Sequence, residues 1–269
     1  IEKRLDVVIY INGLPLVVVE LKNATDEKAT VRKAFTQIQN YKKAVPSIFY
    51  YNALCIISDG IDAKTSSLSA PFTRFLSWKA PKESNNLSIN IKNTLPLAAE
   101  PTTEYDKTEL QILTEQMLQK EVLLKLMRYC TVFESEEKKD VNTGLISIVK
   151  IKKVAAYHQY YVVQKAVEQT LRATHKTDGD RKVGVVWHTQ GSGKSLTMLF
   201  ASWKLRTLPQ LNNPTILIVV DRIDLDEQIS GTFGAVKMPN TTRANSIDGL
   251  KKKLKEDRRE VIISTIFKF

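Results

Sequence analysis

The chain opens with two apolar runs separated by a short polar break. Leu5–Ile11 and Leu16–Lys22 are rich in β-branched residues, and an Asn-Gly pair at 12–13 lies between them. Asn-Gly between two such runs predicts a β-hairpin. Thr25–Val45 then carries apolar residues at helical spacing, which predicts a helix with Asp26 and Glu27 in its first turn.

Less regular patterns follow the hairpin and its helix. Leu54–Ser58 predicts a short buried strand, and the aromatic, amphipathic stretch Pro71–Lys79 predicts a helix that packs on the sheet. The polar, proline-bearing stretch Ser84–Pro101 is typical of a connector. Asp106–Phe133 predicts a helical spacer, and Glu134–Asp140 is a run of charges that we expect to be solvated.

The second half alternates strand and helix patterns. The predicted elements are, in order, a strand at Leu145–Val154, a helix at Ala155–Ala173, a strand at Val183–Trp187, a helix at Ser195–Leu205, a strand at Pro214–Asp221, a helix opening at Ile223–Ser230 and a strand at Val261–Phe269. Such alternation implies an α/β domain with a parallel sheet, which binds ligands at the carboxyl ends of its strands.

The amino-acid composition says more about the class of binding partner than about the fold. With 269 residues, 43% apolar and 26% charged, the chain suits two globular domains. Lys and Arg outnumber Asp and Glu by 40 to 29, and the net charge of +11 favours a polyanion, with nucleic acid the first choice and an ordinary basic surface the alternative. Two isolated cysteines, no signal peptide and no membrane-length apolar run predict a cytoplasmic protein without structural zinc.

The clearest chemistry lies between the predicted strand at Val183–Trp187 and the helix after it. The intervening HTQGSGKS places three small residues, a lysine and a serine where strand, loop and helix meet, as in a phosphate-binding loop. We expect its backbone N–H groups to bind phosphate. The loop residues are Thr189, Gln190, Gly191, Ser192, Gly193, Lys194 and Ser195, with Lys194 on the phosphates of ATP and Ser195 on Mg²⁺. His188 stands where such loops usually begin with glycine, and the alternative is a plain glycine turn.

A second candidate site depends on the register of the hairpin. Glu20 and Lys22 are two residues apart and share a face. A two-residue Asn-Gly turn would put Asp6 and Glu20 on opposite faces, whereas a three-residue loop would put them on one face. We predict the three-residue loop, because two carboxylates on adjacent strands can hold Mg²⁺. The alternative is a Glu20–Lys22 ion pair, worth at most about 1 kcal/mol if exposed.

Longer strings add a family resemblance. DVVIYINGLPLVVVELK, QIQNY, CIISDGIDAKTSS and FTRFLSWK resemble the nuclease domain of type I restriction endonuclease motor subunits, which is similar to the PD-(D/E)xK nucleases. The resemblance implies that Asp6, Glu20 and Lys22 are catalytic, with Asp6 and Glu20 on Mg²⁺. It also matches Gln37 and Tyr41 to the QxxxY motif, which is thought to lie beside the active site and to contact DNA.

The second half resembles the same family. WHTQGSGKS is close to the motor sequence of these subunits, VDRIDLDEQ is similar to helicase motif Ia, and VIISTIFKF is similar to motif Ib. Gln159 matches the helicase Q motif, in which a glutamine reads the adenine edge; by residue type alone it would be a surface glutamine. The chain stops before an acidic DEAD/DEAH-type strand and a second motor lobe, so we expect incomplete ATPase activity.

These observations give one reading with two alternatives. We expect a PD-(D/E)xK-like nuclease domain at 1–100, a helical connector at 101–144 and a first RecA-like lobe at 145–269, cut from a longer protein at both ends. The resemblance implies Mg²⁺-dependent cleavage of double-stranded DNA, ATP-driven translocation, and modification and specificity subunits as partners. The alternatives are another nuclease–helicase fusion that acts in DNA repair, and a non-catalytic DNA-binding scaffold.

Overall fold

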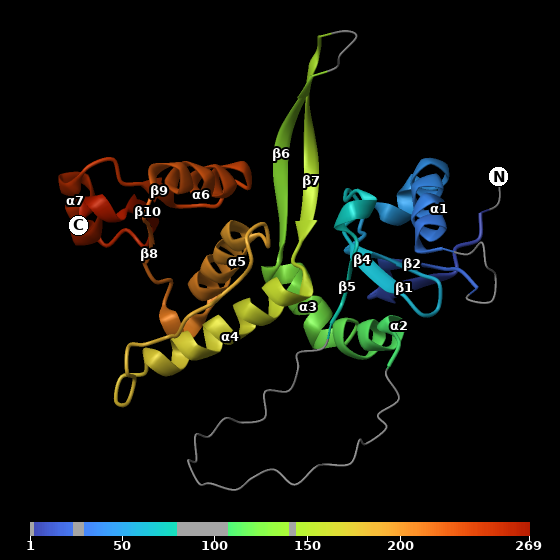
Figure 1. Ribbon diagram of the computed structural model, residues 1–269, viewed down its shortest axis with the longest axis horizontal. Coiled ribbons are helices and arrows are strands. Elements are labelled where there is room, and N and C mark those ends of the chain that lie inside the picture. Colours follow the sequence, from blue (N-terminus) through green and yellow to red (C-terminus); the bar gives the residue numbers. More distant parts are fainter. Residues whose placement is uncertain (1–2, 24–29, 80–106, 140–143) are drawn as a thin grey trace, which may run out of the picture. The chain divides into compact units, whose positions relative to one another are not determined.

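The computed structural model describes residues 3–23, 30–79, 107–139 and 144–269 (Figure 1). The chain forms two compact units: unit 1 comprises Ile1–Thr65 and Phe72–Leu123, and unit 2 comprises Ser66–Pro71 and Leu124–Phe269. Both contain helices and strands, so the predicted mixed α/β class is confirmed. None of the helices in the described ranges combines the length and apolar character that crossing a membrane requires.

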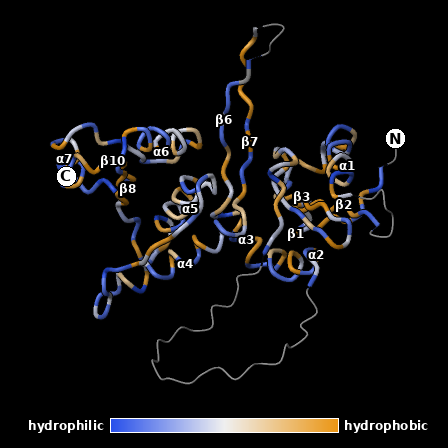
Figure 2. Tube along the Cα trace, in the orientation of Figure 1, coloured by the Kyte–Doolittle hydropathy of each residue, from blue (hydrophilic) through white to orange (hydrophobic). Residues whose placement is uncertain are grey.

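Unit 1 is built on a five-stranded sheet with the strands in chain order. The strands are β1 (Val7–Ile11), β2 (Leu14–Leu21), β3 (Leu54–Ser58), β4 (Ala63–Ser66) and β5 (Leu76–Ser77). β1 and β2 are antiparallel, as the hairpin pattern predicted, and β2 and β3 are parallel. Every residue of β3 is buried, and the middle of β2 is buried on both faces. These strands are among the most hydrophobic segments of the unit (Figure 2).

Helix α1 (Val31–Ala44) packs on this sheet through the side chains at the predicted inward positions. Val31, Ala34 and Ile38 are buried, as the helical spacing predicted. The helix begins later than expected, because the Thr30 side chain accepts a hydrogen bond from the Lys33 backbone N–H at 3.2 Å and caps the first turn. The predicted first turn with Asp26 and Glu27 lies outside the described residues.

The aromatic stretch after β4 is not the helix that its pattern suggested. Residues Phe72–Arg74 form a short 3₁₀ turn (η2), and Leu76–Ser77 is β5, which pairs with β4. The aromatic side chains nevertheless fill the core: Phe75 and Trp78 are buried, and the Phe75 ring lies edge-on to Phe35 at 5.3 Å. Pairing with a neighbouring strand overrides the local amphipathic period here.

The predicted spacer is helical up to Tyr129. It consists of α2 (Glu109–Ile112), a π-helical turn η3 (Leu113–Met117) and α3 (Lys120–Tyr129). The Glu109 carboxylate accepts hydrogen bonds from the Ala63 N–H at 3.0 Å and the Ser77 hydroxyl at 2.8 Å, which fixes α2 to the sheet of unit 1. The predicted connector Ser84–Pro101 lies outside the described residues.

A two-stranded ribbon opens the part of unit 2 that follows α3. β6 (Thr131–Lys139) pairs antiparallel with β7 (Ile146–Val154) along its whole length. The strand predicted at Leu145–Val154 is therefore confirmed. The charge run predicted to be solvated is exposed at Glu136, Glu137 and Lys139, but it lies in a strand that the sequence did not predict. The acidic residues form a strand because β7 supplies ladder partners along them, which a local charge pattern does not reveal.

Unit 2 also contains a parallel sheet in the order β8-β10-β9. The strands are β8 (Ile216–Val220), β10 (Val261–Thr265) and β9 (Thr241–Arg243), and both strand pairs are parallel, as predicted. Helix α6 (Ile223–Ala235) packs against β10, and α7 (Ile247–Glu256) contributes Leu250 to a core with Ala244 and Ile262. The last predicted strand ends early, at Thr265, where a 3₁₀ turn (η5, Ile266–Lys268) begins.

Helices α4 (Tyr157–Ala173) and α5 (Lys194–Thr207) pack on one another and match two predicted helices. The strand predicted at Val183–Trp187 is absent: this run belongs to no sheet of the described chain, and Val185 and Trp187 are 96% and 82% exposed. A segment of high β-propensity does not form a strand unless a neighbouring strand pairs with it. The sheet of β8, β10 and β9 does not include Val183–Trp187.

Candidate functional site

The hairpin places its two acids on one face, but not by the predicted loop. Ile11 pairs with Leu14, so the turn has two residues, and Asn12 and Gly13 both have positive φ, at 51° and 78°. The prediction of a three-residue loop is therefore wrong. The odd residue lies inside β2 instead, because Ile9 pairs with Val17 while Tyr10 pairs with Pro15.

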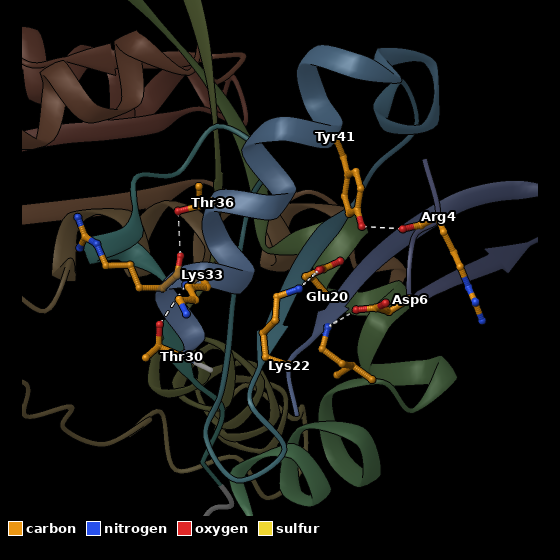
Figure 3. A network of polar contacts seen from close by, with 10 residues as sticks. Arg4, Asp6, Glu20, Lys22, Thr30, Lys33, Thr36 and Tyr41 are labelled. Atoms are coloured by element: carbon orange, nitrogen blue, oxygen red, sulfur yellow. Dashed lines mark hydrogen bonds and ion pairs between the residues drawn. The ribbon is translucent and has the colours of Figure 1, made fainter. Parts of the chain in front are cut away.

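This bulge leaves Leu16 as the extra residue of β2. The register beyond it pairs Val7 with Val19, and its continuation by one residue puts Asp6 opposite Glu20. The Asp6 Oδ2 accepts a hydrogen bond from the Leu21 backbone N–H at 2.8 Å, which holds the carboxylate against β2 (Figure 3). Asp6 and Glu20 therefore share a face, as a two-carboxylate site requires.

Glu20 is a buried carboxylate with only one of its oxygens engaged. Its side chain is 2% exposed, and its Oε1 accepts from the Lys22 ammonium. Its Oε2 is buried with no hydrogen-bond partner among the described residues. Burial raises the pKa of Glu20, the hydrogen bond from Lys22 opposes this rise, and the charge of Asp6 adds to it.

Lys22 and Tyr41 complete the surroundings of this carboxylate. Burial lowers the pKa of Lys22, but Glu20 and Asp6 outweigh it, so the pKa ends above its ordinary value. The Tyr41 hydroxyl donates to the Arg4 carbonyl at 2.6 Å (Figure 3), and burial raises the pKa of Tyr41 while the neighbouring Gln37 acts in the opposite direction. All five residues predicted for the first site, from Asp6 to Tyr41, thus gather between the hairpin and α1.

This donor set fits a divalent cation of the magnesium type. The described residues contain no group of three or more His, Cys, Asp or Glu side chains that could enclose a metal. Two carboxylates on one face, one of them with an unpartnered oxygen, would supply part of an oxygen shell and leave other positions to water. A magnesium site commonly has this incomplete protein shell.

The predicted phosphate loop leads directly into α5. Gly191 and Gly193 both have positive φ, at 79° and 80°, and Gly193 is the N-cap residue of the helix. The Lys194 ammonium turns back and donates to the carbonyl oxygens of His188 at 3.2 Å and Thr189 at 2.9 Å. Two carbonyl groups of the loop therefore bind the Lys194 ammonium at the positive end of the helix. Gln190 and Ser195 lie in the same short segment.

The first turn of α4 contacts this loop through two side chains. His158 Nε2 lies 3.1 Å from the Ser192 carbonyl oxygen, and Gln159 Nε2 donates to the Gly193 carbonyl oxygen at 3.1 Å. Gln159 Oε1 accepts from the Ala156 backbone N–H at 2.9 Å, so the buried amide is engaged at both ends by the chain itself. This arrangement differs from the adenine-reading role expected for Gln159, in which the amide would face a base.

His188, at the position where a glycine was expected, lies against His158. Their ring centroids are 5.3 Å apart in an edge-on arrangement. Burial lowers the pKa of His188, and the charges of His158 and Lys194 lower it further. The contact of His158 with the loop was not predicted from the sequence; its position directly before Gln159 was the only available signal.

Comparison with known proteins matches two separate parts of the chain to protein families. Residues 2–74 match the type I restriction enzyme R protein N-terminal family, and residues 158–269 match the SWI2/SNF2 ATPase family. The first match covers the hairpin, α1 and the buried carboxylate, and the second covers the phosphate loop and the parallel sheet. The chain belongs to the R proteins of type I restriction enzymes and corresponds to their N-terminal part.

Individual relatives agree with this assignment. The type I restriction enzyme HindI endonuclease subunit of Haemophilus influenzae is 46% identical over 233 residues, which are 86% of this chain and 20% of that protein. The putative MjaIXP endonuclease subunit of Methanocaldococcus jannaschii is 31% identical over 274 residues, which are 99% of this chain and 24% of that protein. The SsaAORF53P endonuclease subunit of Staphylococcus saprophyticus is 28% identical over 98% of this chain and 24% of its own length. The chain thus spans between 20% and 24% of the length of these relatives.

Proposed function

We propose that this chain contributes the nuclease centre and the first motor lobe of a type I restriction endonuclease. The reaction is Mg²⁺-dependent cleavage of double-stranded DNA, coupled in the whole enzyme to ATP-driven DNA translocation. The observation that carries the proposal is the buried Glu20 carboxylate, whose Oε2 has no hydrogen-bond partner within the described ranges. Asp6 lies across from it, and Lys22 donates to its other oxygen.

The domain division follows from these two sites. We assign residues 1–100 to a PD-(D/E)xK-like nuclease domain, 101–144 to a connector and 145–269 to a RecA-like lobe. The first assignment is supported by a hairpin whose second strand runs parallel to β3, carries Glu20 and is followed directly by Lys22. The second is supported by a phosphate-type loop at the start of α5 and by a parallel sheet.

In the nuclease centre, Asp6 and Glu20 would hold the metal, which supplies charge stabilisation at a phosphodiester and acidifies a bound water. The chain's own residues do the positioning. Lys22 keeps one oxygen of Glu20 fixed and presents a positive charge at the same place. Burial of Glu20 excludes solvent from one side of the pair. Tyr41 lies beside the acids and is buried, with its hydroxyl held by the Arg4 carbonyl. Gln37, one helical turn before it, would contact the DNA.

In the motor lobe, the residues of the phosphate loop would hold ATP. The backbone N–H groups of Gly193, Lys194 and Ser195, at the start of α5, would provide an anion site. Lys194 would exchange its two carbonyl partners for phosphate oxygens, which its exposed side chain permits. Ser195 would hold the magnesium ion of the nucleotide.

Calorimetric titration of Mn²⁺ into this chain tests the nuclease centre. We expect wild type and Lys194→Ala to bind the metal, and Asp6→Asn and Glu20→Gln to lose binding. Lys194→Ala is the matched control because it removes a charge at the other site. Equal binding by all four proteins, or none by any, would leave the hairpin acids without a metal role and favour the non-catalytic DNA-binding scaffold.

The partners of this chain are double-stranded DNA and the modification and specificity subunits of the restriction complex. The basic net charge of +11 supports the DNA, and the names of the relatives support the complex. A nuclease–helicase fusion of DNA repair would cut without such subunits. Reconstitution of the whole enzyme with and without the two subunits therefore separates these functions: cleavage without them would favour repair.

A further inference from the structure

Two consecutive carbonyl groups of the phosphate loop are held from the same side by the first turn of α4. A carbonyl oxygen can act only as a hydrogen-bond acceptor, so in its contact with the Ser192 carbonyl, at 3.1 Å, His158 Nε2 is the donor. Gln159 donates to the next carbonyl, that of Gly193. The Gly193 carbonyl also accepts the first helical hydrogen bond of α5, from the Thr197 N–H at 3.0 Å.

Peptide geometry converts these contacts into an orientation of the amide groups. In a trans peptide unit the C=O and the following N–H point to opposite sides. A bond from His158 to the Ser192 carbonyl therefore directs the Gly193 N–H away from α4. A bond from Gln159 to the Gly193 carbonyl does the same for the Lys194 N–H. Both amides are then aimed outward at the N-terminus of α5, where an anion is favoured.

The surroundings show that this contact is close. A Cβ atom at Gly193 would lie 2.6 Å from Gln159 Nε2, so the amide rests directly on the loop backbone. Gln159 is 5% exposed and is held at its other end by the Ala156 N–H. The ring of His158 makes edge-type contacts with the rings of Tyr157 and His188, each at 5.3 Å between ring centroids.

We propose that His158, together with Gln159, is a positioning residue that holds the phosphate loop in its phosphate-binding form. On this view His158 and Gln159 act on the phosphates through the loop, and neither side chain needs to touch the base. The inference rests on the proposed nucleotide binding and goes beyond it, because it assigns His158 a role and changes that of Gln159.

Inorganic tripolyphosphate separates this role from adenine recognition, because it has phosphates and no base. Titration calorimetry with Mg²⁺ measures its affinity and that of ATP for the 269-residue chain. The variants are His158→Ala, His158→Gln, Gln159→Ala and Lys194→Ala. Gln169→Ala is the matched control, because Gln169 lies on the same helix and its side chain accepts a hydrogen bond from Arg172 Nε at 2.9 Å.

We expect His158→Ala and Gln159→Ala to lose about two- to tenfold in affinity for both ligands, as the loss of one hydrogen bond predicts. His158→Gln, which keeps a donor, should recover most of the loss, and Gln169→Ala should match wild type. If Gln159→Ala weakens ATP but not tripolyphosphate, Gln159 reads the base and the proposal is wrong for it. If wild type binds and Lys194→Ala does not, while both His158 variants bind like wild type, the role of His158 is refuted. If neither wild type nor Lys194→Ala binds either ligand, the proposed nucleotide site itself fails.

Discussion

The close contact between Gly193 and Gln159 makes a quantitative prediction. Gly193→Ala places a Cβ 2.6 Å from Gln159 Nε2, and the backbone there has a φ of +80°. The left-handed conformation costs a residue with a side chain roughly 1–2 kcal/mol. Displacement of Gln159 removes a hydrogen bond worth about 0.5–1.5 kcal/mol. The total is about 1.5–3.5 kcal/mol.

Gly191 supplies the matched control inside the same loop. Its φ is +79°, but a Cβ there would meet nothing within 4 Å. Gly191→Ala should therefore cost only the free energy of the left-handed backbone conformation, roughly 1–2 kcal/mol. We expect the loop of each free variant to relax and the ligand to restore its strained form. The penalty should thus appear in the dissociation constant, as about 10- to 300-fold for Gly193→Ala and about 5- to 30-fold for Gly191→Ala.

A double-mutant cycle with Gln159→Ala isolates the contact. The assay is titration calorimetry with Mg²⁺ and tripolyphosphate, so that contacts with the base do not enter. In the Gln159→Ala background, Gly193→Ala should retain only the cost of the left-handed backbone conformation, which gives a coupling energy of about 0.5–1.5 kcal/mol. Gly191→Ala should show no coupling. Equal coupling for the two glycines, or none for Gly193, would refute the reasoning.

Three further predictions concern buried titratable groups. Because the folded-state pKa of Glu20 is raised by burial, the folded state binds more protons than the unfolded state above the ordinary value of 4.5. Wild type should therefore lose stability relative to Glu20→Gln as the pH rises from 4.5, and a parallel pH dependence of the two melting temperatures would contradict this. Burial lowers the pKa of Lys204, which donates to Gln164, so the unfolded state holds the proton more tightly. Wild-type stability should rise as the pH approaches 10.5 from below, and a melting curve of Lys204→Met should lack that rise. Both cysteines are fully buried, and burial raises the pKa of Cys130 to about 12. A thiol reagent at about pH 8 should label the native chain much more slowly than the denatured chain; equally fast labelling would place a cysteine at the surface.

The sequence predicts much of the fold wherever local pattern and tertiary packing agree. The helical spacing of apolar residues in Thr25–Val45 predicted α1, and the strand patterns located β3, β8 and most of β10. The failures share one cause, which is the dependence of a strand on a distant partner. Acidic residues from Glu134 onward form a strand because β7 pairs with them. The β-branched run Val183–Trp187 forms none, because no described strand pairs with it.

The candidate sites follow the same rule. The spacing of Gly191, Gly193 and Lys194 predicted a loop before a helix, because that geometry is local. The requirement of a metal site for two carboxylates on one face predicted that Asp6 and Glu20 share a face. It did not predict where the extra residue lies. Asn12-Gly13 suits a two-residue turn, and the bulge at Leu16 depends on the packing of β2 against both of its neighbours.

The position of that bulge has a consequence for how freely the hairpin can be rebuilt. The odd residue lies between the turn and the acids, so the pairing of Val7 with Val19 does not depend on the length of the tip. A longer tip, such as an epitope or a reporter peptide inserted between Asn12 and Gly13, would leave Asp6 opposite Glu20. The exposed Tyr10 and Leu14 mark the end of the hairpin where such an insertion meets solvent. The hairpin thus separates a replaceable tip from a fixed spacing at the acids, and offers an attachment point for labels that report on the site without entering it.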